Sequence, residues 1–148
     1  MNGQQPPLFV YFDGSCGPFN PGGTAAYGFV IRNSDNDILK EGFGRVGSGR
    51  KMSNNVGEYS GLLKAMLTVS ELYPDNAVVY RGDSSLVISQ MKGESRAIKG
   101  LYLPYYEKAA AIAAPFIARR QWQFEWIPRE LNYYADELAQ YHRFKVRR

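Results

Sequence analysis

Apolar and polar residues in the first third of the chain are arranged as in three consecutive strands. Residues 8–12 are apolar on both faces, which is typical of a central strand, and Asp13 ends the strand expected at 8–13. A loop rich in glycine and proline is expected to follow. Residues 25–33 and 38–47 are rich in β-forming side chains, although glycines weaken the second of these segments. Because polar turns separate the three segments, we expect an antiparallel meander.

A helical period replaces the strand pattern after residue 53. Apolar residues recur every three or four positions between Ser53 and Pro74, and Glu58 falls on the same stripe. Similar signals predict helices at 84–93, 101–120 and 132–146, and strands at 77–83 and 121–128. The order β-β-β-α-β-α-α-β-α predicts an α/β fold, in which helices cover both faces of a mixed sheet.

Composition indicates a folded protein in a reducing compartment. The 148 residues suffice for one domain, 1–148, and 45% of them are hydrophobic. A single cysteine excludes an internal disulfide, and no apolar run approaches the roughly 18 residues of a membrane helix. The first residues lack the pattern of a signal peptide, so we expect a cytoplasmic protein with no membrane partner. We also expect a flexible N-terminus at 1–7 and a basic C-terminal tail at 142–148.

Four carboxylates occupy positions that favour a common explanation. Asp13 lies in an apolar strand, Glu58 on an apolar helix stripe, Asp83 at the end of a strand and Asp136 early in the last helix. A buried, unpaired carboxylate costs several kcal/mol, and a divalent cation is an economical way to neutralise it. Asp83 could instead cap a helix, and Asp136 is favoured by the helix dipole in any case. Spacing alone does not show that the four residues converge.

Four motifs together resemble a known family. They are YFDGSCGPFNPGGTAAYGFVI, SNNVGEYSGLLKAM, GDSSLVISQM and WIPRELNYYADELA, and they resemble the successive motifs of type 1 ribonuclease H from about residue 8 to 141. The resemblance implies the ribonuclease H-like fold. Its five-stranded sheet has three antiparallel strands followed by two parallel ones, in the order 3-2-1-4-5, with helices on both faces.

The resemblance also implies an activity. Members of this family are endonucleases that hydrolyse the RNA strand of RNA–DNA hybrids with two Mg²⁺ or Mn²⁺ ions, leaving 5′-phosphate and 3′-hydroxyl ends. One ion activates the attacking water and the other stabilises the departing 3′ oxygen. The residues that match the family's catalytic and metal-binding set are Asp13, Glu58, Asp83 and Asp136.

Residues around the first two motifs are expected to contact the substrate. Those expected at the minor groove of the hybrid, where 2′-hydroxyls are displayed, are Gly14, Ser15, Cys16 and Asn20. Those expected at bases, sugars and a DNA-strand phosphate are Lys51, Ser53, Asn54 and Asn55. The same stretch has a purely structural reading, in which Ser53 or an asparagine caps the following helix.

Two features of many family members are missing. The loop before Asp136 reads PRELN and carries no histidine, and the sole histidine, His142, follows that aspartate. Arg129 stands in the loop, where it could contact a phosphate or remain a solvated charge. The segment MKGESRAIKGLY is too short for the basic protrusion of bacterial members. The chain therefore resembles archaeal members of the family.

The alternative function is a non-catalytic protein of the same fold that binds RNA–DNA hybrid or double-stranded RNA. The presence of all four carboxylates disfavours it, because a pure binder gains nothing from negative charge that faces phosphates. We expect a monomer whose partner is an RNA–DNA hybrid, with double-stranded RNA left open as a second ligand.

Overall fold

A five-stranded mixed sheet forms the centre of the molecule. The computed structural model describes the backbone of residues 5–146 and the side chains of residues 5–140. The strands are β1 (Gln5–Gly17), β2 (Thr24–Arg32), β3 (Ile38–Ser48), β4 (Asn76–Gly82) and β5 (Trp122–Trp126). They lie in the order β3-β2-β1-β4-β5. The pairs β1–β2 and β2–β3 are antiparallel, whereas β1–β4 and β4–β5 are parallel. The expected sheet and its strand order are confirmed.

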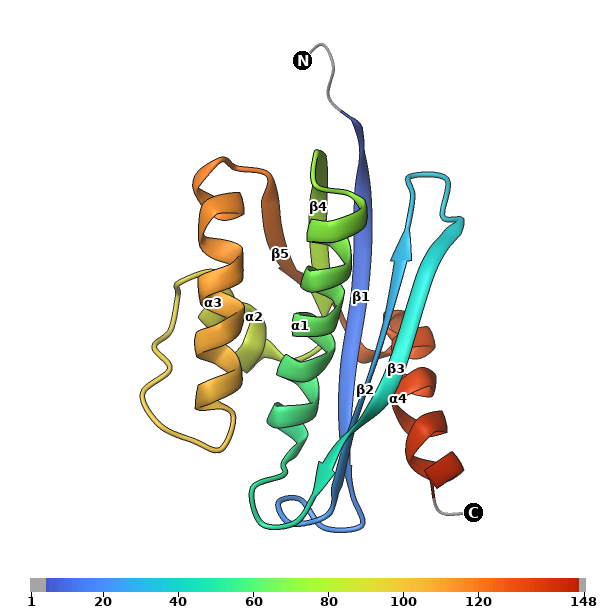
Figure 1. The fold of residues 1–148 in the computed structure, drawn as a ribbon, viewed down its shortest axis with the longest axis vertical. Coiled ribbons are helices and arrows are strands. Elements are labelled where there is room, and N and C mark those ends of the chain that lie inside the picture. Colours follow the sequence, from blue (N-terminus) through green and yellow to red (C-terminus); the bar gives the residue numbers. More distant parts are fainter. Residues whose placement is uncertain (1–4, 147–148) are drawn as a thin grey trace.

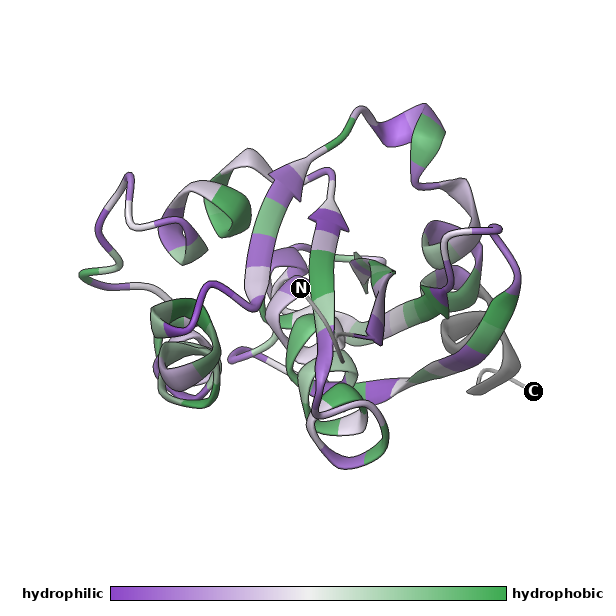
Figure 2. Cartoon of the chain, turned by 90° about the horizontal axis from the view of Figure 1, so that it is seen from above, coloured by the Kyte–Doolittle hydropathy of each residue, from purple (hydrophilic) through white to green (hydrophobic). Residues whose placement is uncertain are grey.

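Helices lie on both faces of this sheet, as expected. The helical elements are α1 (Asn54–Leu72), α2 (Ser85–Met91), α3 (Leu103–Ala118), the 3₁₀ helix η1 (Arg129–Leu131) and α4 (Tyr133–Val146). Helix α1 packs on β1 and β2 with α3 beside it, and α4 packs on β1, β2 and β3 from the opposite side (Figure 1). Seen from above, the sheet separates α1 and α3 from α4 (Figure 2). Within the described residues, no helix is long and apolar enough to cross a membrane.

The main hydrophobic core lies between the sheet and helices α1 and α3. Strand β1 contributes Leu8, Val10 and Phe12, which alternate with residues that face the other side. Helix α1 contributes a stripe that includes Tyr59 and Leu62, and all these side chains are buried. The alternation of hydrophobic and hydrophilic residues along the strands is visible in Figure 2.

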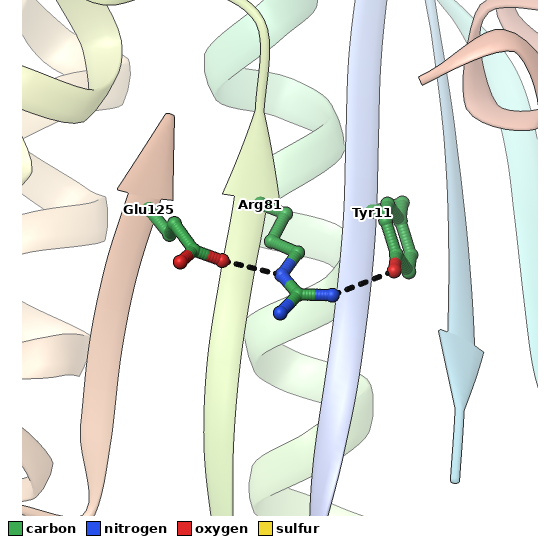
Figure 3. A network of polar contacts seen from close by, with 3 residues as sticks. All are labelled: Tyr11, Arg81 and Glu125. Carbon is green, nitrogen blue, oxygen red and sulfur yellow. Dashed lines mark hydrogen bonds and ion pairs between the residues drawn. The ribbon is translucent and has the colours of Figure 1, made fainter. Parts of the chain in front are cut away.

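The opposite face of the sheet carries a polar network where β1, β4 and β5 lie side by side. Figure 3 shows Arg81 between Tyr11 and Glu125, on the side away from α1. The Arg81 Nε donates to Glu125 Oε1 at 2.6 Å, and its Nη1 donates to the Tyr11 hydroxyl at 2.8 Å. The guanidinium also lies 4.7 Å from the centre of the Phe9 ring. Arg81 therefore binds across three strands on this face.

Strand β1 is longer at both ends than its sequence indicates. Asp13 lies within the strand, opposite Gly28 of β2, and pairing with β2 continues to Gly17. The loop expected from residue 14 therefore starts four residues later. At the other end Gln5 pairs with Asn76, so the expected flexible segment 1–7 is too long. Residues 1–4 lie outside the described part of the chain.

The last helix ends at residue 146, as its expected range of 132–146 predicts, and it overlaps the segment expected as a basic tail. Helix α4 continues to Val146, so most of the segment expected as a basic tail, 142–148, has a helical backbone. Residues 147–148 and the side chains of 141–146, including that of His142, lie outside the described residues.

A glycine on β2 lets α4 pack close to the sheet. A β-carbon on Gly28 would lie 2.6 Å from both the Ala135 carbonyl oxygen and the Leu138 β-carbon. We therefore expect Gly28→Ala to lower the free energy of unfolding by about 1–3 kcal/mol, because α4 would have to move away. Urea denaturation measures the change.

Gly47→Ala in β3 is the matched control. Its added β-carbon would meet only the flexible end of Met52, with Sδ at 3.4 Å. We expect the free energy of unfolding to stay within about 0.5 kcal/mol of the parent value. Equal losses in the two variants would show that close packing at Gly28 is unimportant.

Candidate active site

Three carboxylates that are far apart in sequence meet at one point of the structure. Asp13 comes from β1, Glu58 from the first turns of α1, and Asp83 directly follows β4. One carboxylate oxygen from each lies within 4.8 Å of the other two. Asp13 is 4% exposed and Glu58 3% exposed, while Asp83 is partly exposed. The spacing of these residues along the sequence did not show that they converge, and the structure brings the three together.

Glu58 reaches Asp13 because α1 touches β1 through glycines. A β-carbon on Gly14 would lie 2.1 Å from the Glu58 backbone nitrogen and 2.2 Å from the Gly57 carbonyl carbon. Only glycine therefore fits at position 14 without moving the helix. The helix begins at this point because Ser53 caps it, its Oγ accepting from the Val56 N–H at 3.2 Å.

Asp83 is held by its neighbours in the parallel half of the sheet. Its main-chain carbonyl accepts from the Trp126 indole N–H at 3.1 Å, which ties it to the end of β5. The Asn132 side chain opposes the rise in the pKa of Asp83, and its Nδ2 donates to the Phe12 carbonyl at 2.9 Å. Asn132 is thus anchored to the strand that carries Asp13.

Asp136 completes the set from the other side of the sheet. It lies in the first turn of α4, where its N–H donates to the Asn132 carbonyl at 3.1 Å. It lines the same open pocket of about 580 Å³ as the three converging carboxylates. All four acids expected from the sequence therefore border one pocket, with Asp136 beside the closely spaced three.

Burial makes simultaneous ionisation of these acids unfavourable. It raises the pKa of Asp13 from 3.8 to about 7, opposed by a hydrogen bond with Glu58 and reinforced by the negative charge of Asp83. Burial, followed by the charge of Asp13, raises the pKa of Glu58 well above its usual value. Burial also raises the pKa of Asp83, and the positive charge of Arg129 opposes this shift.

The donor set fits a hard divalent cation. Carboxylate oxygens are the ligands that Mg²⁺ and Mn²⁺ prefer, and Glu58 Oε1 is buried without a hydrogen-bond partner. Arg81, two residues from Asp83, is occupied by Glu125 and Tyr11 on the open face of the sheet and does not neutralise the cluster. A cation bound by these carboxylates would offset the cost of burying them together.

Four of the expected substrate residues border this pocket. They are Gly14, Asn20, Asn54 and Arg129. A hydrogen bond fixes the side chain of Asn20: its Oδ1 accepts from the Asn54 backbone N–H at 2.9 Å. This bond joins the loop after β1 to the first turn of α1, so both asparagines lie on the same rim.

The other expected substrate residues lie outside the pocket lining. Ser15 is 3% exposed and its hydroxyl donates to the Ala139 carbonyl at 3.4 Å, so its side chain faces α4. The Cys16 thiol donates to the Phe19 carbonyl at 3.2 Å. Ser53 caps α1, Asn55 is half-buried in its first turn, and Lys51 is exposed just before it. Contacts from these residues to a substrate remain a prediction.

Several pocket residues were not anticipated. They are Ser84, Ser85, Leu86 and Gln140. Gln140 lies four residues after Asp136, and this helical spacing could have identified it. The buried side chain of Asn132 donates to the Phe12 carbonyl beside the pocket. That role depends on tertiary contacts and leaves no local signal.

Comparisons with known proteins agree with this fold. A family model described as reverse transcriptase-like matches residues 11–142. The bifunctional protein Rv2228c of Mycobacterium tuberculosis is 37% identical over 121 residues, which are 81% of this chain and 31% of that protein. Ribonuclease HI of Halobacterium salinarum is 31% identical over 132 residues, which are 89% of this chain and 62% of that protein. The chain therefore spans about a third of the mycobacterial relative's length.

A solved structure is similar over nearly the whole chain. LC11-RNase H1, crystallised in complex with an RNA/DNA hybrid, superposes with a TM-score of 0.84 at 29% sequence identity. The match covers 95% of this chain and 99% of that one. Since the family model and this similarity both extend over nearly the whole described chain, the protein belongs to the reverse transcriptase-like family and, within it, to the type 1 ribonucleases H.

Proposed function

We propose that this chain is an endonuclease that hydrolyses the RNA strand of RNA–DNA hybrids and leaves 5′-phosphate and 3′-hydroxyl ends. The observation that carries the proposal is the meeting of Asp13, Glu58 and Asp83 within 4.8 Å, with Asp136 at the same pocket. The relative LC11-RNase H1 was crystallised with an RNA/DNA hybrid, which supports this class of substrate.

The carboxylates divide into two overlapping ligand sets. We assign Asp13, Glu58 and Asp83 to one divalent ion, and Asp13 with Asp136 to a second. Two Mg²⁺ or Mn²⁺ ions would supply an activated water and stabilise the departing 3′ oxygen in an in-line displacement. Asp13 belongs to both sets because both Glu58 and Asp136 influence its ionisation and line the same pocket.

Neutral and cationic groups on the rim would hold the hybrid. Gly14 has no side chain, so a sugar–phosphate strand can approach the backbone closely. Asn20 and Asn54 carry amides that can donate and accept, as recognition of a 2′-hydroxyl requires. Arg129 lies close enough to Asp83 to influence its ionisation, which places positive charge where a scissile phosphate would bind.

Cleavage of labelled hybrid tests the proposal directly. We expect Mg²⁺- or Mn²⁺-dependent cleavage of the RNA strand that stops on chelation, and no cleavage of double-stranded DNA. The same assay on RNA–RNA duplexes determines whether double-stranded RNA is also a substrate. A non-catalytic binder would instead retain the hybrid in a gel-shift assay without cutting it, and that result would exclude the proposed activity.

Asp13→Asn removes the carboxylate common to both ligand sets while keeping the side chain's shape. We expect cleavage to fall by a thousandfold or more, on the order of losses seen when transition-state stabilisation is removed. Steady-state cleavage of a labelled hybrid measures the change. Asp75→Asn is the matched control, because Asp75 is exposed and does not line the pocket. Near-normal activity of Asp13→Asn would refute the assigned ligand sets.

The raised pKa of Asp13 predicts how stability depends on pH. The folded protein holds this proton up to about pH 7, whereas the unfolded chain releases it near 3.8. The resulting stabilisation is complete below about pH 4 and is lost as the pH rises through 7. We therefore expect Asp13→Asn to become more stable than the parent protein by roughly 2–4 kcal/mol as the pH rises from 4 to 8 in chelator.

Denaturant unfolding of both proteins measures this difference and cancels the contribution of groups that do not interact with Asp13. Saturating Mg²⁺ should reduce it at pH 8, because the deprotonated cluster binds the cation. A difference that does not change with pH would contradict the assignment of the raised pKa to Asp13.

Arg129→Ala tests the cationic rim. We expect the KM for hybrid to rise severalfold, because a phosphate contact is lost, with a smaller effect on kcat. Arg119→Ala is the control, since Arg119 lies at the end of α3 and stacks on Phe116. If the two variants have the same KM, Arg129 is only a solvated charge.

A further inference from the structure

A second pocket lies between α1, α3 and the β2–β3 side of the sheet. It has a volume of about 600 Å³ and shares no residue with the pocket of the carboxylates. Leu63 and Leu67 of α1 line it together with Ile112 of α3 and Val46 of β3, and Leu67 is 50% exposed. We call this apolar depression the α1–α3 groove.

Positive charge surrounds the α1–α3 groove. Arg45 of β3, Lys64 of α1 and Lys108 of α3 all line it, so each of its three walls contributes a cation. No aspartate or glutamate is among the described residues that line it. Within the described part of the chain, none of the three cationic side chains forms an ion pair.

This combination defines the chemistry of an occupant. Three unpaired cations attract an anion, and the leucines beneath them favour a bulky apolar group. A nucleic-acid duplex offers phosphates, but it has no apolar side chain that could fill the floor. An acidic peptide with an aromatic or large aliphatic residue offers both features, and Tyr27 and Tyr105 add aromatic surface to the walls.

We propose that the α1–α3 groove binds an acidic peptide segment of a partner protein, whose bulky apolar side chain packs on Leu63 and Leu67. The acidic residues pair with Arg45, Lys64 and Lys108 around the rim. Such binding tethers the protein to a partner from the side of α1 that does not border the catalytic pocket. It goes beyond hydrolysis of the hybrid and does not depend on it.

Fluorescence anisotropy tests the proposal with a defined probe. The probe is a fluorescein-labelled peptide of four aspartates followed by glycine and phenylalanine. Two control peptides replace the phenylalanine by serine or the aspartates by lysines. We expect saturable binding of the probe, at least about tenfold weaker binding of the serine peptide and no binding of the lysine peptide. Equal affinity for all three peptides would overturn the proposal.

Charge reversal localises the binding. We expect Lys64→Glu combined with Lys108→Glu to weaken binding of the probe at least about tenfold. Lys40→Glu should change it by less than about twofold, because Lys40 is exposed on β3 outside the groove. Leu67→Ser should weaken binding of the phenylalanine peptide but not that of the serine peptide, which separates lost apolar contact from misfolding.

Hybrid cleavage by the same variants separates the groove from the nucleic-acid site. We expect unchanged kcat and KM in the charge-reversed protein, since neither lysine lines the catalytic pocket. A raised KM without any peptide binding would assign the groove to the hybrid instead and overturn the proposal. Self-association of the parent protein that charge reversal abolishes would assign it to a second copy of the chain, with the same consequence.

Discussion

The direct contact between the backbones of β1 and α1 is the constraint on which the site depends. At Gly14 the helix lies so close to the strand that a single β-carbon would overlap Glu58 and Gly57. On the other face, Gly28 lets α4 approach β2 closely. Gly28 is the residue of β2 that pairs with Asp13 of β1. Helices α1 and α4 therefore pack on opposite faces of the sheet at the same position along β1 and β2. Since Glu58 and Asp136 lie on these helices, glycine packing sets their distance from Asp13.

This packing brings carboxylates together at the base of an open pocket, where Asp13 and Glu58 are almost completely buried. Burial raises the pKa of Asp13, Glu58 and Asp83 alike, so full ionisation of the cluster without a bound cation is unfavourable. The surrounding structure tolerates the cost because Asp13 lies within a strand paired on both sides and Phe12 beside it is fully buried. Because the backbone of Asp13 is fixed in the sheet and its side chain is only 4% exposed, its carboxylate lies ready as a ligand in the cluster. The free-energy cost of burying these carboxylates together is thus what makes the site suitable for binding a divalent cation.

Local sequence signals predicted most helices and strands. The structure differs from the prediction where tertiary contacts determine the end of a strand or the partner of a side chain. Hydrophobic periodicity identified the strands and the four α-helices, because each buries one stripe or face. Residues 14–17 read as loop, since glycine and cysteine next to a proline give no strand pattern, yet pairing with β2 extends β1 to Gly17. The four carboxylates were recognisable from their contexts, whereas the contacts of Ser15, which was expected at the substrate, and of Asn132 were not. Their side chains bind backbone carbonyls more than 100 residues away, at Ala139 and Phe12, which no local pattern encodes.

Helix α1 contributes residues both to the acidic pocket and to the α1–α3 groove. The two sets of residues do not overlap. Its first turns carry Glu58 against β1, while Leu63, Lys64 and Leu67 lie further along and border the groove. Glu58 is fixed by the backbone contact at Gly14 and not by the side chains that line the groove. The core stripe of the helix, including Leu62 and Met66, is fully buried between the two sites, so a ligand in the groove can act on Glu58 only by moving the whole helix. That movement would bring the backbones of α1 and β1 into collision or pull them apart. A peptide bound in the groove therefore adds a tether to the protein without altering the arrangement of its carboxylates.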